Sequence, residues 1–396
     1  MTKMFKRRFL FSLLRYCGFL AVLFMIACAP VSKPVKKRFF WPLPVAGVEP
    51  RIEYLGFWQS DKDLQGTGSG WVERSILGEY PPVPLFRSPF YIAALTDGRV
   101  AISDTVLRKV IILDTKKGVV RELMDEDGEP YEFYLPMGLA GSDNGDVLVA
   151  DSMRGEVVRF GADEKRVGSF GGVSVLSHPV DVAVHDRGKL VCVSDLVEHN
   201  VTVFDLWGNL LYKVGERGSQ DGQFNFPTAL DFDDNGNLFV LDTLNFRVQM
   251  FDSALRFKRA FGEAGTASGA FRMPKGLAVS PYGHVYVSDG LSHKVVVFDL
   301  EGNYLLTFGG KSYAVASGEV TPGGFFAPRG VEVDSAGQIM VVDGINSMIQ
   351  RFQFLTDDYL KENPVSEEEI YLPPDLRLQP RTPFAPVSKP SEAFND

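Results

Sequence analysis

The chain has 396 residues, with 41 Lys or Arg against 50 Asp or Glu, and a formal charge of −9. A chain this acidic has no general electrostatic attraction to nucleic acid, so we expect no nucleic-acid partner. Its 45% hydrophobic content is that of a globular protein.

The first 27 residues read as an export signal. Residues 1–15 carry five cations and no anion, and residues 16–27, "YCGFLAVLFMIA", form a short apolar run. The run is shorter than the roughly 20 residues that a membrane-spanning helix needs, which makes a transmembrane anchor the weaker interpretation. The run leads through "MIAC" to Cys28. This resembles the lipobox of bacterial lipoproteins, in which the Cys becomes the lipidated first residue of the mature protein.

By analogy with that family, Ala29 in place of an Asp implies the outer membrane, on either its periplasmic or its cell-surface side. Cleavage before Cys28 would remove five cations and no anion, which takes the formal charge from −9 to −14. Of three cysteines, Cys17 would leave with the signal and Cys28 would be acylated. Only Cys192 would remain, so no internal disulfide is possible. Because Cys192 lies in the apolar run "LVCVSD", we expect a buried, inert thiol.

Two Pro-rich segments flank the central region. Residues 28–50 are Pro-rich and basic, which predicts an extended tether between lipid and domain. Residues 356–396 are acidic at first and then Pro-rich, which predicts a mobile tail. The hexapeptide "APVSKP" occurs at 29–34 and again at 385–390, and we have no physical account of this duplication.

Between these ends the sequence repeats six times. One marker is a Pro that opens each unit, and the second is an Asp that closes a short "V-x-D" run. The Pro spacings are 47, 43, 48, 47 and 54 residues, and the Asp spacings are 47, 44, 47, 47 and 54. The markers are Pro89, Pro136, Pro179, Pro227, Pro274 and Pro328, and Asp104, Asp151, Asp195, Asp242, Asp289 and Asp343. Because two markers keep step, the period is a structural unit.

Each unit contains four short runs of β-branched and aromatic residues separated by Gly, Asn and Asp turns, with no sustained helical period. Four antiparallel strands in about 45 residues make one propeller blade. The sequence therefore predicts an all-β fold, a six-bladed β-propeller over residues 51–355. The last unit lacks its fourth strand, whereas residues 51–59 form an isolated strand before the first unit. We expect residues 51–59 to pair with the last blade and close the ring.

One unit carries a family resemblance. Residues 224–265, "FNFPTALDFDDNGNLFVLDTLNFRVQMFDSALRFKRAFGEAG", resemble an NHL repeat, with its Pro, Gly-Asn turn, "V-x-D", "N-x-R-V" and "F-G" in order. The resemblance covers roughly residues 51–354. Blades 2, 3 and 6 depart most from the pattern; blade 2 has Gly155 and Glu156 in place of "N-x-R", and blade 6 has Met348.

A protein-binding function follows best from these features. In a propeller the loops that lead into the innermost strands share one face with the loops that join the second and third strands. The longest connections on that face are residues 60–87 and 311–324. Long connections in a regular repeat commonly hold recognition sites. We therefore predict a monomeric, non-enzymatic scaffold that binds envelope proteins through 60–87 and 311–324.

Metal chemistry is the main alternative. Some NHL-like propellers resemble peptidyl-amidoglycolate lyases, which use a His-ligated zinc, or calcium-dependent lactonases. His178, His199 and His293 are the zinc candidates, but they are spread over different loops. Near the axis, Asp181, Asp231 and Glu332 interrupt a set of small residues. They are candidates for a calcium site, or alternatively acceptors of backbone N–H bonds at blade edges.

Two cations follow their repeat Pro directly. Lys275 and Arg329 lie at equivalent positions in blades 5 and 6. They could meet an anionic ligand, or form salt bridges with the axial acids. No nucleophile is paired with a base at a recognisable spacing, so we expect no cofactor other than the structural calcium or zinc of the alternative.

Overall fold

The computed structural model describes residues 37–42, 49–64, 81–313 and 320–371. The chain divides into two compact units. The described part of the smaller unit is Lys37 with Ser366–Glu369, in which the Ser366 hydroxyl and N–H donate to the Glu369 carboxylate. The larger unit holds every described strand and is considered by itself below.

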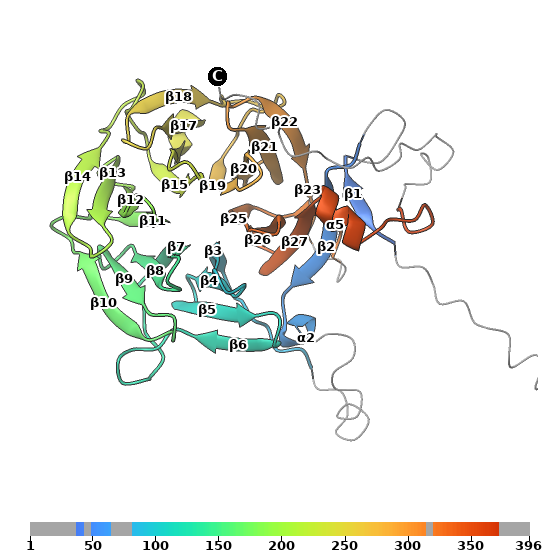
Figure 1. Ribbon diagram of the computed structural model, residues 1–396, viewed down its shortest axis with the longest axis horizontal. Helices are drawn as coiled ribbons and strands as arrows, with labels where there is room; N and C mark the ends of the chain where they lie inside the picture. The colour runs from blue at the N-terminus through green and yellow to red at the C-terminus, as the bar shows by residue number, and fades with distance from the viewer. Residues whose placement is uncertain (1–36, 43–48, 65–80, 314–319, 372–396) are drawn as a thin grey trace, which may run out of the picture. The chain divides into compact units, whose positions relative to one another are not determined.

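The larger unit is a six-bladed propeller whose sheets surround a common axis (Figure 1). All strand pairs within the blades are antiparallel, as the sequence predicts. Blade 1 consists of β3 (Pro89–Ala94), β4 (Val100–Asp104), β5 (Lys109–Asp114) and β6 (Val119–Glu122). Blade 2 consists of β7 (Pro136–Gly141), β8 (Val147–Asp151), β9 (Glu156–Phe160) and β10 (Arg166–Gly171). Blade 3 consists of β11 (Pro179–His185), β12 (Leu190–Asp195), β13 (Asn200–Asp205) and β14 (Leu210–Val214).

The second half of the ring repeats this order. Blade 4 consists of β15 (Pro227–Phe232), β16 (Leu238–Asp242), β17 (Arg247–Phe251) and β18 (Phe257–Phe261). Blade 5 consists of β19 (Pro274–Ser280), β20 (His284–Asp289), β21 (Lys294–Asp299) and β22 (Tyr304–Phe308). Blade 6 contains β25 (Pro328–Val333), β26 (Gln338–Asp343) and β27 (Met348–Phe354). Short elements between blades are the 3-10 helix η1 (Thr243–Asn245) and the parallel pair β23 (Gly310–Lys311) and β24 (Gly324–Phe325).

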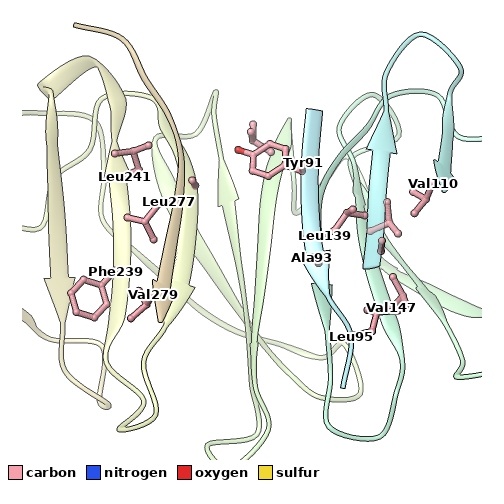
Figure 2. Packing of buried hydrophobic residues seen from close by; sticks show 14 of the residues in the cluster. Tyr91, Ala93, Leu95, Val110, Leu139, Val147, Phe239, Leu241, Leu277 and Val279 are labelled. Atoms are coloured by element: carbon pink, nitrogen blue, oxygen red, sulfur yellow. The ribbon is translucent and has the colours of Figure 1, made fainter. Parts of the chain in front are cut away.

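Burial explains which strands are continuous apolar runs and which alternate between covered and exposed residues. The second strands are apolar apart from polar residues at their ends because other blades cover both of their faces, and every residue of β4 and β8 is buried. The fourth strands have one solvated face, so β18 alternates between half-buried and exposed residues. The core lies between neighbouring blades, where Leu277 and Val279 of β19 pack beside Phe239 and Leu241 of β16 (Figure 2).

The N-terminal strand closes the ring. Strand β2 (Ile52–Trp58) pairs antiparallel with β27, with Ile52 opposite Phe354 and Trp58 opposite Ile349. This is the closure that the sequence predicts from residues 51–59. The ring is thereby closed by one strand from each end of the domain, and β2 covers the edge of β27 that blade 6 would otherwise leave open.

The two flanking segments are more ordered than the sequence suggests. Strand β1 (Phe39–Trp41) lies within the expected tether, yet it pairs with β2, and Phe40 is buried against Leu355 and Ile370. Helix α5 (Asp357–Glu362) lies within the expected tail. In both places, apolar side chains next to prolines pack against blade 6 as completed by β2, which we call the composite blade. The free energy of this burial stabilises local structure that the Pro-rich composition alone does not predict. Cys28 and both "APVSKP" copies lie outside the described residues.

Two further observations bear on the sequence predictions. Cys192 is a free, buried thiol whose pKa is raised by burial, as expected for an inert cysteine. In the described ranges, no helix has the length and apolar character needed to cross a bilayer. The predicted signal segment, residues 1–27, is outside those ranges.

Candidate functional site

One end of the propeller gathers twelve loops, two from each blade; we call it the loop face. The two sequence markers meet here, because the Pro that begins each first strand is the cross-strand partner of the Asp that ends the second, as in Pro274 opposite Asp289. This pairing explains why the two markers keep the same period.

The six repeat Asp residues fasten these loops. Asp289 is typical: one carboxylate oxygen accepts the Arg272 N–H at 2.6 Å, and the other accepts the N–H groups of Leu291 and Ser292 at 3.1 and 2.9 Å. All six Asp side chains are fully buried. Each carboxylate accepts backbone donors from the loop that leads into its blade. The loop after it is held by further backbone N–H groups or, in blade 4, by the Asn245 side-chain amide, so the role of these Asp residues is structural.

Each second-to-third-strand loop ends in the same backbone conformation. The fourth residue after the repeat Asp has a φ between 51° and 66° in every blade. These residues are Arg108, Gly155, His199, Phe246, His293 and Ser347. A left-handed residue at this position turns the chain back towards the third strand. The second residue after the Asp is therefore left at the outermost point of the loop.

That outermost residue is a large apolar side chain in all six blades. We call these six side chains the tips; their exposed fractions run from 43% to 64%. They are Val106, Met153, Val197, Leu244, Leu291 and Ile345. The tip side chain takes no part in the backbone bonds to the Asp, so the turn does not require it to be apolar. The sequence analysis missed the tips, although an apolar residue two positions after each repeat Asp is visible in the sequence.

Two arginines lie beside an exposed aromatic ring in these loops. Arg108 and Arg154 stack on the exposed ring of Tyr134, with centroid distances of 5.2 and 4.6 Å.

Lys275 and Arg329 lie just inside this face. Arg329 donates to the Ser88 hydroxyl at 3.0 Å and to the Pro89 carbonyl at 3.1 Å, so it bridges blade 6 to blade 1. Burial, and next the charge of Arg329, lower the pKa of Lys275. No described residue forms a salt bridge with either side chain, so the alternative that they pair with the axial acids is wrong.

The histidine candidates have separate environments. His199 Nδ1 accepts the Phe226 N–H at 3.1 Å, and His293 Nδ1 accepts the Ala327 N–H at 3.1 Å. Each thereby joins its blade to the next, and burial lowers the pKa of both imidazoles. His178 is exposed. The described part of the chain contains no group of three or more His, Cys, Asp or Glu placed to hold a metal ion.

The axial acids line a small cavity of about 120 Å³. Asp181 accepts the Leu230 N–H at 3.0 Å, and Asp231 accepts the Val279 N–H at 2.8 Å, in each case from the next blade. Both thus accept backbone bonds at blade edges, as the structural alternative predicted. Burial raises the pKa of Asp231 to about 7 and also raises the pKa values of Asp181 and Glu332, with mutual repulsion adding to that of Glu332.

The long connections are described only at their stems. Residues 65–80 and 314–319 lie outside the described residues, whereas α2 (Asp61–Leu64) belongs to the first stem. Gln59 donates to the Asn346 carbonyl at 3.0 Å, and the Asn346 amide donates to the Ser312 carbonyl at 3.2 Å. Both stems therefore meet at the second-to-third-strand loop of blade 6. Partner recognition by 60–87 and 311–324 stays a prediction.

Comparisons with known proteins agree with the fold. The NHL repeat matches residues 271–298, which span most of blade 5. A Caenorhabditis elegans protein named as a probable peptidyl-alpha-hydroxyglycine alpha-amidating lyase is 30% identical over 146 residues, or 34% of this chain. The match spans 41% of that relative's length.

Among solved structures, a gluconolactonase from Xanthomonas campestris is 18% identical with a TM-score of 0.53, covering 82% of this chain and 99% of that chain. A protein of unknown function from Bacteroides thetaiotaomicron is 17% identical with a TM-score of 0.54, covering 68% of this chain and 70% of that chain. These structural likenesses show the propeller fold alone.

Proposed function

We propose that this chain is a non-enzymatic binding propeller that engages a partner protein with its loop face. The observation that carries the proposal is the ring of six apolar tips, one from each blade, all exposed. Exposed apolar side chains that recur on one face of a molecule are candidates for an interaction site. Because the backbone of each loop is held by a buried Asp, a polar tip would serve the turn equally well.

Arg108 and Arg154, which stack on the exposed Tyr134 ring, are the charged groups of the face that the structure places against an exposed aromatic side chain. A partner surface that combines apolar and acidic side chains would complement the tips and these two arginines.

The test exchanges tips for serine and compares them with equally exposed side chains elsewhere. The tip variant carries Val197→Ser, Leu244→Ser and Leu291→Ser, and the control carries Val167→Ser, Leu210→Ser and Leu211→Ser on fourth strands. After crosslinking in native envelopes and affinity purification, we expect the control to retain a stoichiometric protein partner and the tip variant to lose it. Equal recovery by both variants, or no partner above background, would contradict the proposal.

We also propose that the protein is exported and held in the bacterial envelope by lipid on Cys28. The support is the basic segment, the short apolar run and the "MIAC" sequence. Labelling of cells with a radioactive fatty acid should mark the wild type and leave Cys28→Ser unlabelled. A labelled Cys28→Ser protein would show that any acyl group sits elsewhere.

A metal-dependent lyase or lactonase is the second candidate. The 30% identity to the amidating lyase over 146 residues favours it. This candidate predicts stoichiometric zinc or calcium in protein purified without chelators, and conversion of a peptidyl-alpha-hydroxyglycine to a peptide amide. Both should fail in His178→Ala or Asp231→Ala. Metal-free protein without that activity would exclude it.

A further inference from the structure

A second concave site lies far from the tips, at the seam between blades 5 and 6. It is a cavity of about 690 Å³, the size of a small-molecule site. Its walls come from blade 5, from β2 and β27 of the composite blade, and from α5. The lining includes Tyr282, His284, Leu305, Phe354, Asp357 and Lys361.

The composite blade creates this site. After β27 the chain turns into α5 instead of adding a fourth strand, because β2 already occupies that place (Figure 1). Thr356 caps the helix by accepting the Tyr359 N–H at 3.2 Å, which fixes the start of α5 at the mouth of the cavity. One face of the blade 5 sheet, where Tyr286, Val297 and Leu306 are cross-strand neighbours, forms one wall, and α5 supplies charged side chains.

The interior of the cavity is aromatic. The ring of Phe354 lies 4.8 Å from that of His284 and 5.7 Å from that of Tyr282, measured between centroids. Tyr286 is buried behind them. Burial lowers the pKa of His284 to about 4, so its imidazole is neutral at physiological pH. The inner wall therefore carries no charge.

One carboxylate at the mouth is unmatched. Lys361 pairs with Asp358 at 2.9 Å, and Arg51 pairs with Glu49 at 2.9 Å. Asp357 forms no ion pair with any described residue, and its Oδ1 atom is enclosed without a hydrogen-bond donor. An enclosed carboxylate oxygen without a donor is costly, and a ligand that supplies the donor removes this cost.

We propose that this cavity binds an organic amine with an apolar or aromatic body. The ammonium group donates to the Asp357 carboxylate, which lines the cavity, and supplies the positive charge that this carboxylate lacks among the described residues. The body lies against Phe354 and Tyr282, whose ring faces also attract a cation. A carboxylate beside aromatic rings, with every other charged pair at the mouth satisfied, selects a cation over an anion or a neutral molecule.

The test uses 2-phenylethylamine as the probe and 2-phenylethanol as its neutral match, in calorimetric titrations of the purified protein. We expect saturable binding of the amine with one site per chain, and binding of the alcohol that is at least about tenfold weaker. Equal affinities for the two probes, or no saturable binding of the amine, would overturn the proposal.

Two variants and one control locate the site. Asp357→Asn should weaken binding of the amine about tenfold, whereas Asp358→Asn, its neighbour in the same helical turn, should change affinity little. Leu305→Trp should abolish binding by filling the mouth, since Leu305 is exposed at its edge. Unchanged affinity in Asp357→Asn, or in a folded Leu305→Trp protein, would contradict the assignment.

Discussion

Blades 4 and 6 carry the same repeat but are assembled differently. Blade 4 is one continuous segment, whereas blade 6 combines β25–β27 with β2 from the start of the domain. Their loop ends are nevertheless alike. Asn245 and Gln249 donate to the repeat Asp of blade 4 at 2.8 and 3.1 Å, and the equivalent amides of blade 6 donate to theirs at 2.8 and 2.9 Å.

The loop ends of the two blades differ in one cation that contacts the repeat Asp. In blade 4 Arg247 Nε lies 2.9 Å from Asp242, whereas blade 6 has the buried Met348 in the same register. Asp343 has no ion pair among the described residues, and burial raises its pKa to about 6. Blade 6 therefore forms with a buried Asp and two side-chain amides but without the Arg, so the Arg is dispensable to the fold of a blade. Each of the two blades also has an exposed apolar tip, Leu244 in blade 4 and Ile345 in blade 6, although neither turn requires an apolar residue there.

The largest effect is expected where the two assemblies differ most, in the fourth strand. Ile52 of β2 is 1% exposed, so Ile52→Ala should lower the free energy of unfolding by about 2–5 kcal/mol. Lys258→Ala in β18, the fourth strand of blade 4, is exposed and should cost less than about 0.5 kcal/mol. Urea unfolding measures both, and equal costs would mean that β2 adds nothing to the ring.

Arg247→Met would give blade 4 the residue of blade 6. Loss of a charged hydrogen bond to a buried Asp should cost about 1.5–3 kcal/mol at neutral pH. The cost should exceed that of Arg256→Met, because Arg256 is 79% exposed at Asp252 and solvent screens its ion pair. Urea unfolding of the two variants at neutral pH measures the difference. Equal losses in the two variants would refute the explanation that an ion pair to a buried Asp supports blade 4.

The axial acids of blades 4 and 6 occupy equivalent positions, and they predict a pH dependence. The pKa of Asp231 is about 7, well above its unfolded value, so this residue binds a proton on folding. Stability should therefore fall as pH rises from about 4 to 7, by up to about 1.4 kcal/mol per pH unit for one such group. Glu332 and Asp181 act in the same direction.

Asp231→Asn tests this assignment. It should flatten the decline in the free energy of unfolding between pH 5 and 7, whatever its effect on absolute stability. Asp252→Asn should leave the decline unchanged, because hydrogen bonds from Arg256 lower the pKa of Asp252 and it titrates below this range. An unaltered pH profile in Asp231→Asn would show that other groups cause the dependence.

The smallest effect on stability is expected at the tips. Leu244→Ser and Ile345→Ser should each change the free energy of unfolding by less than about 0.5 kcal/mol, because both side chains are exposed and neither supports its turn. Thermal unfolding of the two single variants measures this directly. A loss above about 1 kcal/mol would give the tips a structural role and weaken the binding proposal.

Much of the fold can be predicted from the sequence because its period is strict. Two markers recur together since Pro and Asp are cross-strand partners in every blade, and the missing fourth strand of the last unit predicts the closure by residues 51–59. The Pro-rich composition predicted a tether and a mobile tail where the structure has the strand Phe39–Trp41 and the helix Asp357–Glu362. Their burial depends on surfaces that exist only once the ring has closed.

The candidate sites were less predictable. The sequence shows an apolar residue two positions after each repeat Asp. It does not show that this residue is exposed, because the exposure follows from the left-handed backbone at the fourth position after the Asp. The cavity at α5 brings together residues from Arg51 to Lys361, far apart in the chain, so no local pattern indicates it. His199 and His293 looked like metal candidates because a sequence does not show which backbone N–H an imidazole accepts.

The most direct test of the central claim places a photo-crosslinking amino acid at one position at a time in native envelopes. The positions are the tips Leu244 and Ile345, with the equally exposed Leu210 of the outer strand β14 as the reference. The account predicts that both tips form an adduct with the same partner protein and that Leu210 does not. Adducts at Leu210 alone, or at none of the three positions, would contradict a loop face that binds protein.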